Sequence, residues 1–273
     1  MKYHIIILFS IFLLAAGYFL YLRSNRRLVT VVLRGGLGNR IFQILAAQGY
    51  AEKHNRTCII TQSFNMKGKQ EHEDNSLEPL HALFPDIEVR DTIEDYEIIH
   101  APAFEYKDLP DSPKNVVLRG YCQSERYFPT VIPDIRKTYY PNTYFIHVRA
   151  GDYLTNKIHY IDLTQYHMRT IKEIQRNDPA AKFLVFSDDT AYAQQYMKQF
   201  RIPFHTSAAK TAEETLFEMS ACAGAICANS SLSWLGAYFQ KQPRNHIYMP
   251  DRWINDGQDT TDVYPSWAKK VSV

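Results

Sequence analysis

Short apolar runs that end abruptly in polar or glycine-rich turns limit most strongly how this chain can fold. The clearest run, Tyr144 to Val148, is β-branched and aromatic and stops at the turn Arg149–Asp152. Similar runs recur along the chain, and most are followed by an apolar pattern with helical spacing. An alternation of strands and helices predicts parallel sheets with right-handed crossovers. We therefore expect an α/β fold.

Four of these strand-to-helix turns carry groups that suit a phosphate or a sugar, namely Gly35–Asn39, Arg149–Asp152, Ser187–Asp189 and Asn229–Ser231. Ligands of open α/β sheets bind outside the carboxyl ends of the strands, where His147, Arg149 and Asp152 would lie. Simpler explanations remain open: Arg149 can pair with Asp152 at the sheet edge, glycines can serve only the turn, and Asn or Ser can cap a helix. Suitable groups at all four turns together favour a ligand-binding cleft.

A proline-marked segment between Pro129 and Pro141 predicts a crossover between two halves, residues 28–140 and 141–273. With 273 residues and 45% hydrophobic content, the chain can bury one large core or two modest ones. Residues 91–113 contain three prolines and are expected to be irregular. The net charge of +2 argues against a nucleic-acid partner, and the four scattered cysteines do not form a zinc ligand set.

The amino-terminal region, residues 1–27, contains an almost uncharged run from Ile5 to Leu22. As a helix of 18 residues it would span about 27 Å, close to the ~30 Å hydrocarbon core of a bilayer. We expect a transmembrane anchor, with a cleaved signal peptide as the alternative, because the run is long for a signal peptide and lacks a good cleavage site.

Two sequence features disagree about the topology of this expected anchor. The arginines that follow the span would place the large domain in the cytosol by the positive-inside rule; they are Arg23, Arg26 and Arg27. Two N-glycosylation patterns, beginning at Asn55 and Asn229, indicate a lumen instead. The sequence therefore leaves open whether the large domain lies in the cytosol or in a lumen.

Several motifs, in this order, resemble the α1,2-fucosyltransferases of glycosyltransferase family 11. They are RGGLGNRIFQILAAQGYA, RGYCQSERYF, HVRAGDY, FSDDTAYA, CANSSLSWLGAYF and MPDRW with the terminal YPSWAKKV. The resemblance, over about residues 30–273, implies a GT-B-like enzyme with two Rossmann-like halves facing a cleft. Such an enzyme transfers L-fucose from GDP-fucose, with inversion and without a metal, to the 2-hydroxyl of a galactose-terminated glycan acceptor. With the anchor, we expect a single-pass type II membrane protein of the Golgi with a lumenal catalytic domain.

The resemblance also implies roles for individual residues. Arg149 would bind the β-phosphate of GDP with His147 beside it, and Glu214 would bind the guanine or ribose. The glycine-rich and serine turns would contact the donor through Gly36, Leu37, Gly38, Asn39, Ser230, Ser231 and Leu232. From the strand-end turns we add Asp188 and Asn229 to the donor site. Asp152, His147 and Glu125 are open as candidates for the base that accepts the acceptor proton.

One departure from the family pattern bears on activity. The family usually reads HVRRGDY, and here Ala150 stands where the second arginine would be. The position of Glu214 is commonly Asp. A missing cation leaves open a membrane-anchored protein that binds a nucleotide-sugar or glycan without turnover, and a transferase of another GDP-sugar or linkage is a further alternative.

Overall fold

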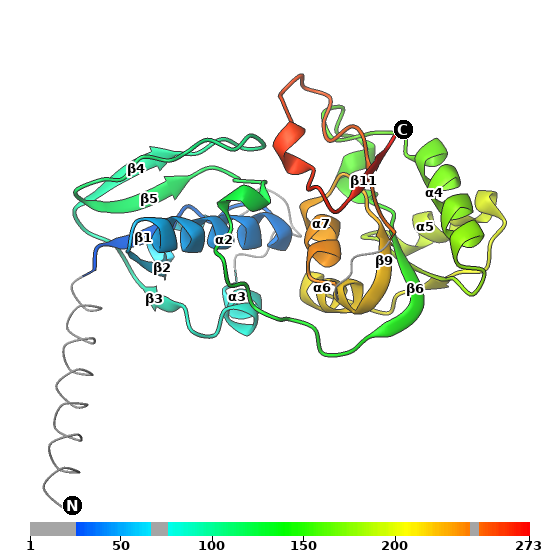
Figure 1. The fold of residues 1–273 in the computed structure, drawn as a ribbon, viewed down its shortest axis with the longest axis horizontal. Coiled ribbons are helices and arrows are strands. Elements are labelled where there is room, and N and C mark those ends of the chain that lie inside the picture. The colour runs from blue at the N-terminus through cyan, green and yellow to red at the C-terminus, as the bar shows by residue number, and fades with distance from the viewer. Residues whose placement is uncertain (1–25, 67–75, 241–245) are drawn as a thin grey trace, which may run out of the picture.

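The computed structural model describes residues 26–66, 76–240 and 246–273, and within them the strands form two parallel sheets (Figure 1). The first has the order β3-β2-β1-β5-β4, and all of its neighbours are parallel. Its strands are β1 (Leu28–Val31), β2 (Thr57–Thr61), β3 (Glu88–Arg90), β4 (Tyr96–His100) and β5 (Asn115–Arg119).

The second sheet has the order β11-β10-β9-β6-β7-β8 and is also parallel throughout. Its strands are β6 (Tyr140–His147), β7 (Lys182–Phe186), β8 (His205–Thr206), β9 (Cys222–Ile226), β10 (Ile247–Pro250) and β11 (Lys269–Val271). The predicted α/β class with two parallel-sheet halves is confirmed. The change of sheet falls where β6 begins, but a division into domains at residue 140 stays a prediction.

Helices connect the strands of both sheets. They are α2 (Leu37–Lys53), α3 (Glu78–Leu83), α4 (Thr164–Asn177), α5 (Thr190–Met197), α6 (Ala212–Ala221) and α7 (Ser231–Tyr238). Single 3₁₀ turns are η1 (Gln62–Phe64), η2 (Glu125–Tyr127), η3 (Gly151–Leu154), η4 (Lys198–Phe200) and η5 (Thr261–Val263). The expectation of an irregular segment over residues 91–113 is wrong at β4. Because β4 is an edge strand in which only Ile99 is buried, it lacks the apolar signal of a core strand.

Aromatic side chains join the two halves in one hydrophobic core. Phe42 of α2 packs against Trp234 of α7, with ring centroids 4.8 Å apart. The carboxyl-terminal segment then returns to the first half, where Trp267 Nε1 donates to Glu125 Oε2 at 2.9 Å and Arg126 pairs with Asp262 at 3.0 Å. These contacts fix the carboxyl ends of the two sheets relative to each other.

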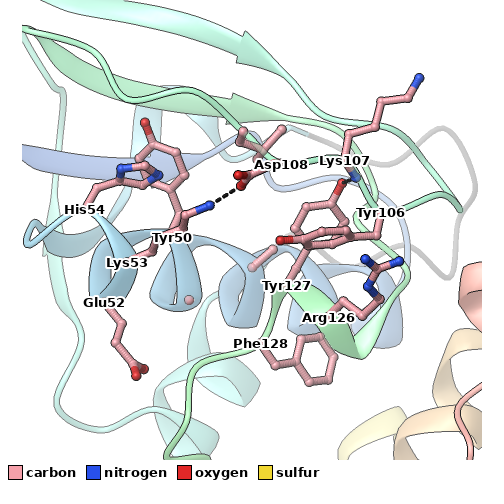
Figure 2. A pocket seen from close by; sticks show the side chains of 13 residues that line it. Tyr50, Glu52, Lys53, His54, Tyr106, Lys107, Asp108, Arg126, Tyr127 and Phe128 are labelled. Atoms are coloured by element: carbon pink, nitrogen blue, oxygen red, sulfur yellow. Dashed lines mark hydrogen bonds and ion pairs between the residues drawn. The ribbon is translucent and has the colours of Figure 1, made fainter.

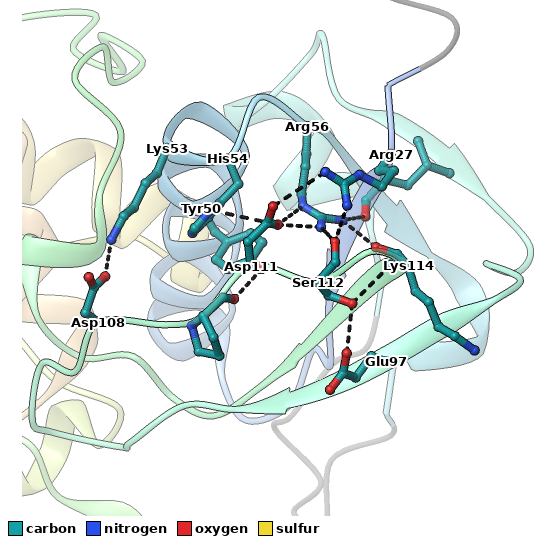
Figure 3. A network of polar contacts seen from close by, with 12 residues as sticks. Arg27, Tyr50, Lys53, His54, Arg56, Glu97, Asp108, Asp111, Ser112 and Lys114 are labelled. Carbon is teal, nitrogen blue, oxygen red and sulfur yellow. Dashed lines mark hydrogen bonds and ion pairs between the residues drawn. The ribbon is translucent and has the colours of Figure 1, made fainter.

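A buried arginine holds the base of the first sheet together (Figure 3). The side chain of Arg56 is fully buried, and its guanidinium pairs with Asp111 at 2.6 Å. It also donates to the carbonyl oxygens of Leu28, Ser112 and Lys114 at 3.3, 2.5 and 2.7 Å. A buried cation is tolerated only when it is paired and hydrogen-bonded in this way. Arg56 therefore joins β1, α2 and the segment before β5.

The prediction of a membrane-spanning protein is contradicted by the structure. Across residues 26–66, 76–240 and 246–273, no helix is both long enough and apolar enough to cross a bilayer. The run from Ile5 to Leu22, to which the transmembrane helix was assigned, lies outside the described residues. The expected single-pass Golgi localisation is corrected on this finding.

Candidate functional site

Both sheets have a topological switch point at their carboxyl edge. In the first sheet, β2 lies on one side of β1 and β5 on the other, so the switch point lies between β1 and β5. In the second sheet, β7 lies on one side of β6 and β9 on the other, so the switch point lies between β6 and β9. Open α/β sheets bind ligands in the crevice outside such a pair of strand ends. The glycine-rich turn follows β1, the Arg149 turn follows β6, and the Asn229 turn follows β9. Three of the four predicted turns thus occupy the switch points, and the fourth follows β7 beside β6.

Arg149 lies directly beyond β6, and two carboxylates hold its guanidinium. One terminal nitrogen contacts Asp188 Oδ2 at 2.8 Å and the other contacts Asp152 Oδ1 at 2.5 Å. The guanidinium carbon lies 4.7 Å from the ring centroid of Tyr153, and the side chain is 19% exposed. The ion pair with Asp152, expected as a purely structural alternative, is present. Arginine carries five N–H donors, so two such pairs leave others for an anionic ligand.

Asp188 organises the turn that carries Arg149. Besides its ion pair, its Oδ1 accepts a hydrogen bond from the backbone N–H of Ala150 at 2.9 Å. Gly151 has φ +46°, and a Cβ there would lie 2.4 Å from Asp188 Oδ2. Only glycine therefore fits at this position of the turn. Asp188 acts here through Arg149 and Ala150, whereas the neighbouring Asp189 caps α5 by accepting from Tyr192 N at 2.9 Å.

Ala150, which stands in place of an arginine of the family pattern, is fully buried. Its backbone N–H is the donor to Asp188, and the residue forms the amino cap of η3. A long cationic side chain at this position would need room that the packed turn does not offer. The departure from the pattern therefore goes together with a close-packed turn.

His147, the last residue of β6, is buried at 4% exposure. Burial, followed by the charge of Arg149 and by His167, lowers the pKa of its imidazole to about 3. Its Nδ1 is buried and has no hydrogen-bond partner among the described residues. A neutral imidazole with an open nitrogen can accept or donate one hydrogen bond at the strand end, but it is a weak base at neutral pH.

The glycine-rich turn and the serine turn, from opposite halves, touch each other. Gly36 is the amino cap of α2, and Leu37 begins the helix. A Cβ on Gly38 would lie 2.6 Å from the backbone nitrogen of Leu232 and 2.7 Å from Ser231 Oγ, in the first turn of α7. The absence of a side chain at Gly38 therefore allows the amino ends of α2 and α7 to meet. Neither amino end has a side-chain cap, so backbone N–H groups of both helices face this junction.

Asn229 is buried at 4% exposure, and its side-chain amide holds two loops in place. Its Nδ2 donates to the carbonyl oxygens of His159 at 2.9 Å and Trp253 at 3.0 Å. Its own carbonyl oxygen accepts from the Tyr153 hydroxyl at 3.4 Å. With both amide hydrogens in use, the side chain positions neighbouring segments, and the glycosylation pattern at Asn229 has no accessible amide.

A relay of polar side chains, which sequence reasoning missed, links the halves across the junction. Asn39 Oδ1 accepts from Gln123 Nε2 at 2.8 Å, and Gln123 Oε1 accepts from Trp253 Nε1 at 3.1 Å. Gln123 is buried, lies just beyond β5 and reaches both the glycine-rich turn and the carboxyl-terminal segment. Its only sequence signal is a polar residue a short distance after a buried strand.

The two remaining predicted residues have contacts of their own. Glu214 lies in the first turn of α6, and its Oε2 accepts from the backbone N–H of Lys210 at 2.7 Å. Glu125, in η2, accepts from Trp267 as described above. Ser230 is the amino cap of α7 through its backbone, and Ser231 opens that helix. The structure thus brings the Arg149, serine and glycine turns to facing sheet edges, with Glu214 on the helix that packs on α7.

Two cavities differ in their relation to these turns. A small one of about 40 Å³ is lined by Arg149, Tyr153, His159 and Asn229 among others, and so opens at the β6 and β9 ends. Another of about 220 Å³ lies beside the carboxyl-terminal part of α2, between Tyr50, Lys53, Tyr106 and Phe128 (Figure 2). The second is remote from the strand ends that carry the polar turns. Its size alone does not make it the site.

Two parallel sheets, whose switch points carry the glycine-rich, Arg149 and Asn229 turns, define a doubly wound α/β fold, a class in which ligands bind at strand ends. The sequence profile described as Glycosyl transferase family 11 matches residues 27–267. The chain belongs to this family and is therefore a glycosyltransferase, as the motifs predicted.

Comparisons with individual proteins agree with this family. The chain is 26% identical to an alpha-1,2-colitosyltransferase of Escherichia coli, over 83% of this chain and 92% of the relative. It is 21% identical to a galactoside 2-alpha-L-fucosyltransferase of Caenorhabditis elegans, over 89% and 79%. Its fold is similar to a glycosyl transferase family 9 protein from Veillonella parvula DSM 2008, with a TM-score of 0.50, 9% identity, and coverage of 90% and 87%. That structural likeness concerns the fold alone.

Proposed function

We propose that this glycosyltransferase has a GT-B-like arrangement and transfers L-fucose from GDP-fucose, with inversion and without a metal ion. The acceptor is the 2-hydroxyl of a terminal galactose-type residue of a glycan. The observation that carries the proposal is the position of Arg149 at the β6/β9 switch point, beside the serine turn that meets the glycine-rich turn of the other half. The galactoside 2-alpha-L-fucosyltransferase relative supports this donor and linkage.

In the proposed step, the acceptor oxygen attacks the anomeric carbon of fucose while the bond from that carbon to the β-phosphate oxygen breaks. Negative charge then builds on the departing phosphate. The unused N–H donors of Arg149 would stabilise that charge, together with backbone N–H groups of the serine turn, and such preorganised donors often supply the largest catalytic contribution. We assign charge neutralisation to Arg149 because its guanidinium lies directly beyond β6, beside the Asn229 turn that follows β9.

The acceptor proton needs a destination, and the candidate bases differ in their surroundings. His147 has a pKa of about 3, so little driving force exists for it to take a proton at neutral pH. Asp152 is partly exposed but is paired with Arg149. Glu125 accepts a hydrogen bond from Trp267, where the carboxyl-terminal segment contacts the first half. We therefore propose that His147 contacts the GDP-fucose donor. The proton of the acceptor hydroxyl would go to Asp152 or to solvent.

The test is to incubate the full chain with GDP-fucose and lactose, with and without EDTA, and to follow released GDP. We expect a fucosylated product in both conditions, and NMR should locate the linkage at the galactose 2-hydroxyl. Binding of GDP without any product would contradict the proposal and favour the binding-only reading raised by Ala150. A product with another linkage would contradict the acceptor assignment alone.

A second donor is favoured by one comparison. The Escherichia coli relative is named for alpha-1,2-colitosyl transfer, and the match covers most of both chains. A colitosyl donor therefore competes with GDP-fucose as the natural donor. Equal concentrations of both donors with one acceptor should give mainly fucosylated product if our assignment is correct.

A further inference from the structure

Arg34 is a second cation at the carboxyl edge, in the half opposite to Arg149. It lies just beyond β1, at the β1/β5 switch point and directly before the glycine-rich turn. Its guanidinium carbon lies 4.3 Å from the ring centroid of Tyr121, which follows β5. The flat packing of guanidinium on an aromatic ring fixes the orientation of its N–H donors. Arg34 is only partly buried, so a ligand in the crevice can reach it.

Two hydrogen-bond donors at this position are buried without a partner. They are Arg34 Nε and Gln43 Nε2, neither of which has an acceptor anywhere in the described part of the chain. Gln43 is fully buried on α2, and its Oε1 accepts from the backbone N–H of Arg34 at 3.1 Å. Burying polar donors without acceptors is unfavourable, so two of them on residues that are hydrogen-bonded to each other favour an acceptor supplied by a ligand.

Among the described residues, Arg34 also has no counter-ion. Within residues 26–66, 76–240 and 246–273, no carboxylate lies within ion-pairing distance of it, whereas Arg149, Arg56 and Arg126 each have at least one. A cation that is held rigidly at a crevice without a counter-ion favours a negatively charged ligand. The two donors without an acceptor and the positive charge of Arg34 therefore all favour a negatively charged oxygen atom as the ligand.

We propose that Arg34 and Gln43 form a second anion-binding subsite, which takes a phosphate of the donor or an acidic group on the acceptor. The assignment of the anion to the donor phosphate or to an acidic group of the acceptor rests on the proposed function, but the binding of an anion does not. The backbone connection through the glycine-rich turn places this subsite next to the junction of α2 and α7. The two halves would then hold a charged substrate from opposite sides.

The first experiment measures binding of inorganic pyrophosphate and of GDP to the full chain by calorimetry. We expect Arg34→Gln to weaken pyrophosphate binding about tenfold or more, the size of one charge-assisted contact. Arg34→Lys should keep part of the affinity and serves if the Gln variant does not fold. The control is Arg136→Gln, because Arg136 pairs with Asp134 in the segment before β6, and so lies near the amino end of that strand and not at the carboxyl ends that carry the turns. Its pyrophosphate affinity should stay within twofold.

Kinetics then separate the two sources of the anion. A higher KM for GDP-fucose with an unchanged KM for neutral lactose identifies the donor phosphate. An unchanged donor KM with a lost preference for sulfated over neutral lactose identifies the acidic acceptor. If pyrophosphate affinity and both KM values are unchanged while the melting temperature falls, Arg34 only packs on Tyr121 and the inference is overturned. If the unaltered chain binds pyrophosphate but neither binds GDP nor transfers fucose, the proposed function fails instead.

Discussion

Substitution of Arg149 tests the central assignment most directly. Arg149→Ala removes the guanidinium that faces the β6/β9 crevice and leaves Asp152 and Asp188 without their cation. Both carboxylates are partly exposed, so the fold should survive the change. Arg149, Asp152 and Asp188 together carry a formal charge of about −1, and the change would make it about −2 where a diphosphate has to bind.

The expected magnitude follows from two contributions. A charge-assisted hydrogen bond is worth about 1.5–3 kcal/mol, which corresponds to roughly a tenfold to 150-fold loss. Repulsion by the two unpaired carboxylates adds to this, although solvent screens part of it. We therefore expect kcat/KM for GDP-fucose to fall by about two orders of magnitude or more in Arg149→Ala.

The assay measures GDP release at saturating lactose, and thermal unfolding of each variant checks the fold. A double variant, Arg149→Ala with Asp188→Asn, keeps the acceptor for the Ala150 N–H and removes one negative charge. It should recover part of the loss, up to about tenfold, because only the repulsive part is relieved. A kcat/KM within threefold of the unaltered enzyme for Arg149→Ala would refute the role of Arg149.

Three further outcomes are expected. Gly38→Ala forces a Cβ against the backbone of Leu232, so it should cost about 1–3 kcal/mol of stability and raise the donor KM, as checked by urea unfolding and kinetics. Arg56→Ala removes a fully buried side chain that pairs with Asp111 and donates to the carbonyl oxygens of Leu28 and Lys114, so it should cost about 3 kcal/mol of unfolding free energy, against less than about 1 kcal/mol for Arg90→Ala in an exposed pair. The pKa of His147 is about 3 when folded and ~6.5 when unfolded, so the unfolded state alone gains a proton as the pH falls below ~6.5. Stability should drop by about 2 kcal/mol between pH 7 and pH 5 from this residue, and His147→Gln should reduce that drop; equal drops in both proteins would contradict it.

The fold was predictable where a strand is buried on both faces. Continuous apolar runs such as Tyr144–Val148 identify core strands of a parallel sheet, and helical spacing identifies the crossovers between them. The edge strand β4 was not predictable, because four of its five residues are exposed and it resembles a loop in composition. Propensity cannot indicate a strand whose main support is backbone pairing with β5.

The candidate site was predictable as a set of strand ends, but not in its contacts. Polar residues after buried strands pointed to Arg149 and to the glycine and serine turns without any structure. The sequence contains no local signal that Asn229 would spend its amide on two loops, or that Gln123 would bridge Asn39 and Trp253. Those bonds join residues that are far apart along the chain, and only the assembled fold brings them together.

The two explanations of Arg149 that the sequence left open, a structural ion pair and a phosphate ligand, are compatible in this structure. The pairs with Asp152 and Asp188 use only part of the five N–H donors and fix the plane of the guanidinium against the Tyr153 ring. A donor group that is already oriented loses less freedom when a phosphate binds than a mobile side chain would. The carboxylates reduce the net attraction for an anion, however, so a site built on Arg149 alone would bind a diphosphate weakly. Arg34, on the opposite edge, has no ion pair within the described part of the chain, and it would supply the charge that the paired Arg149 lacks.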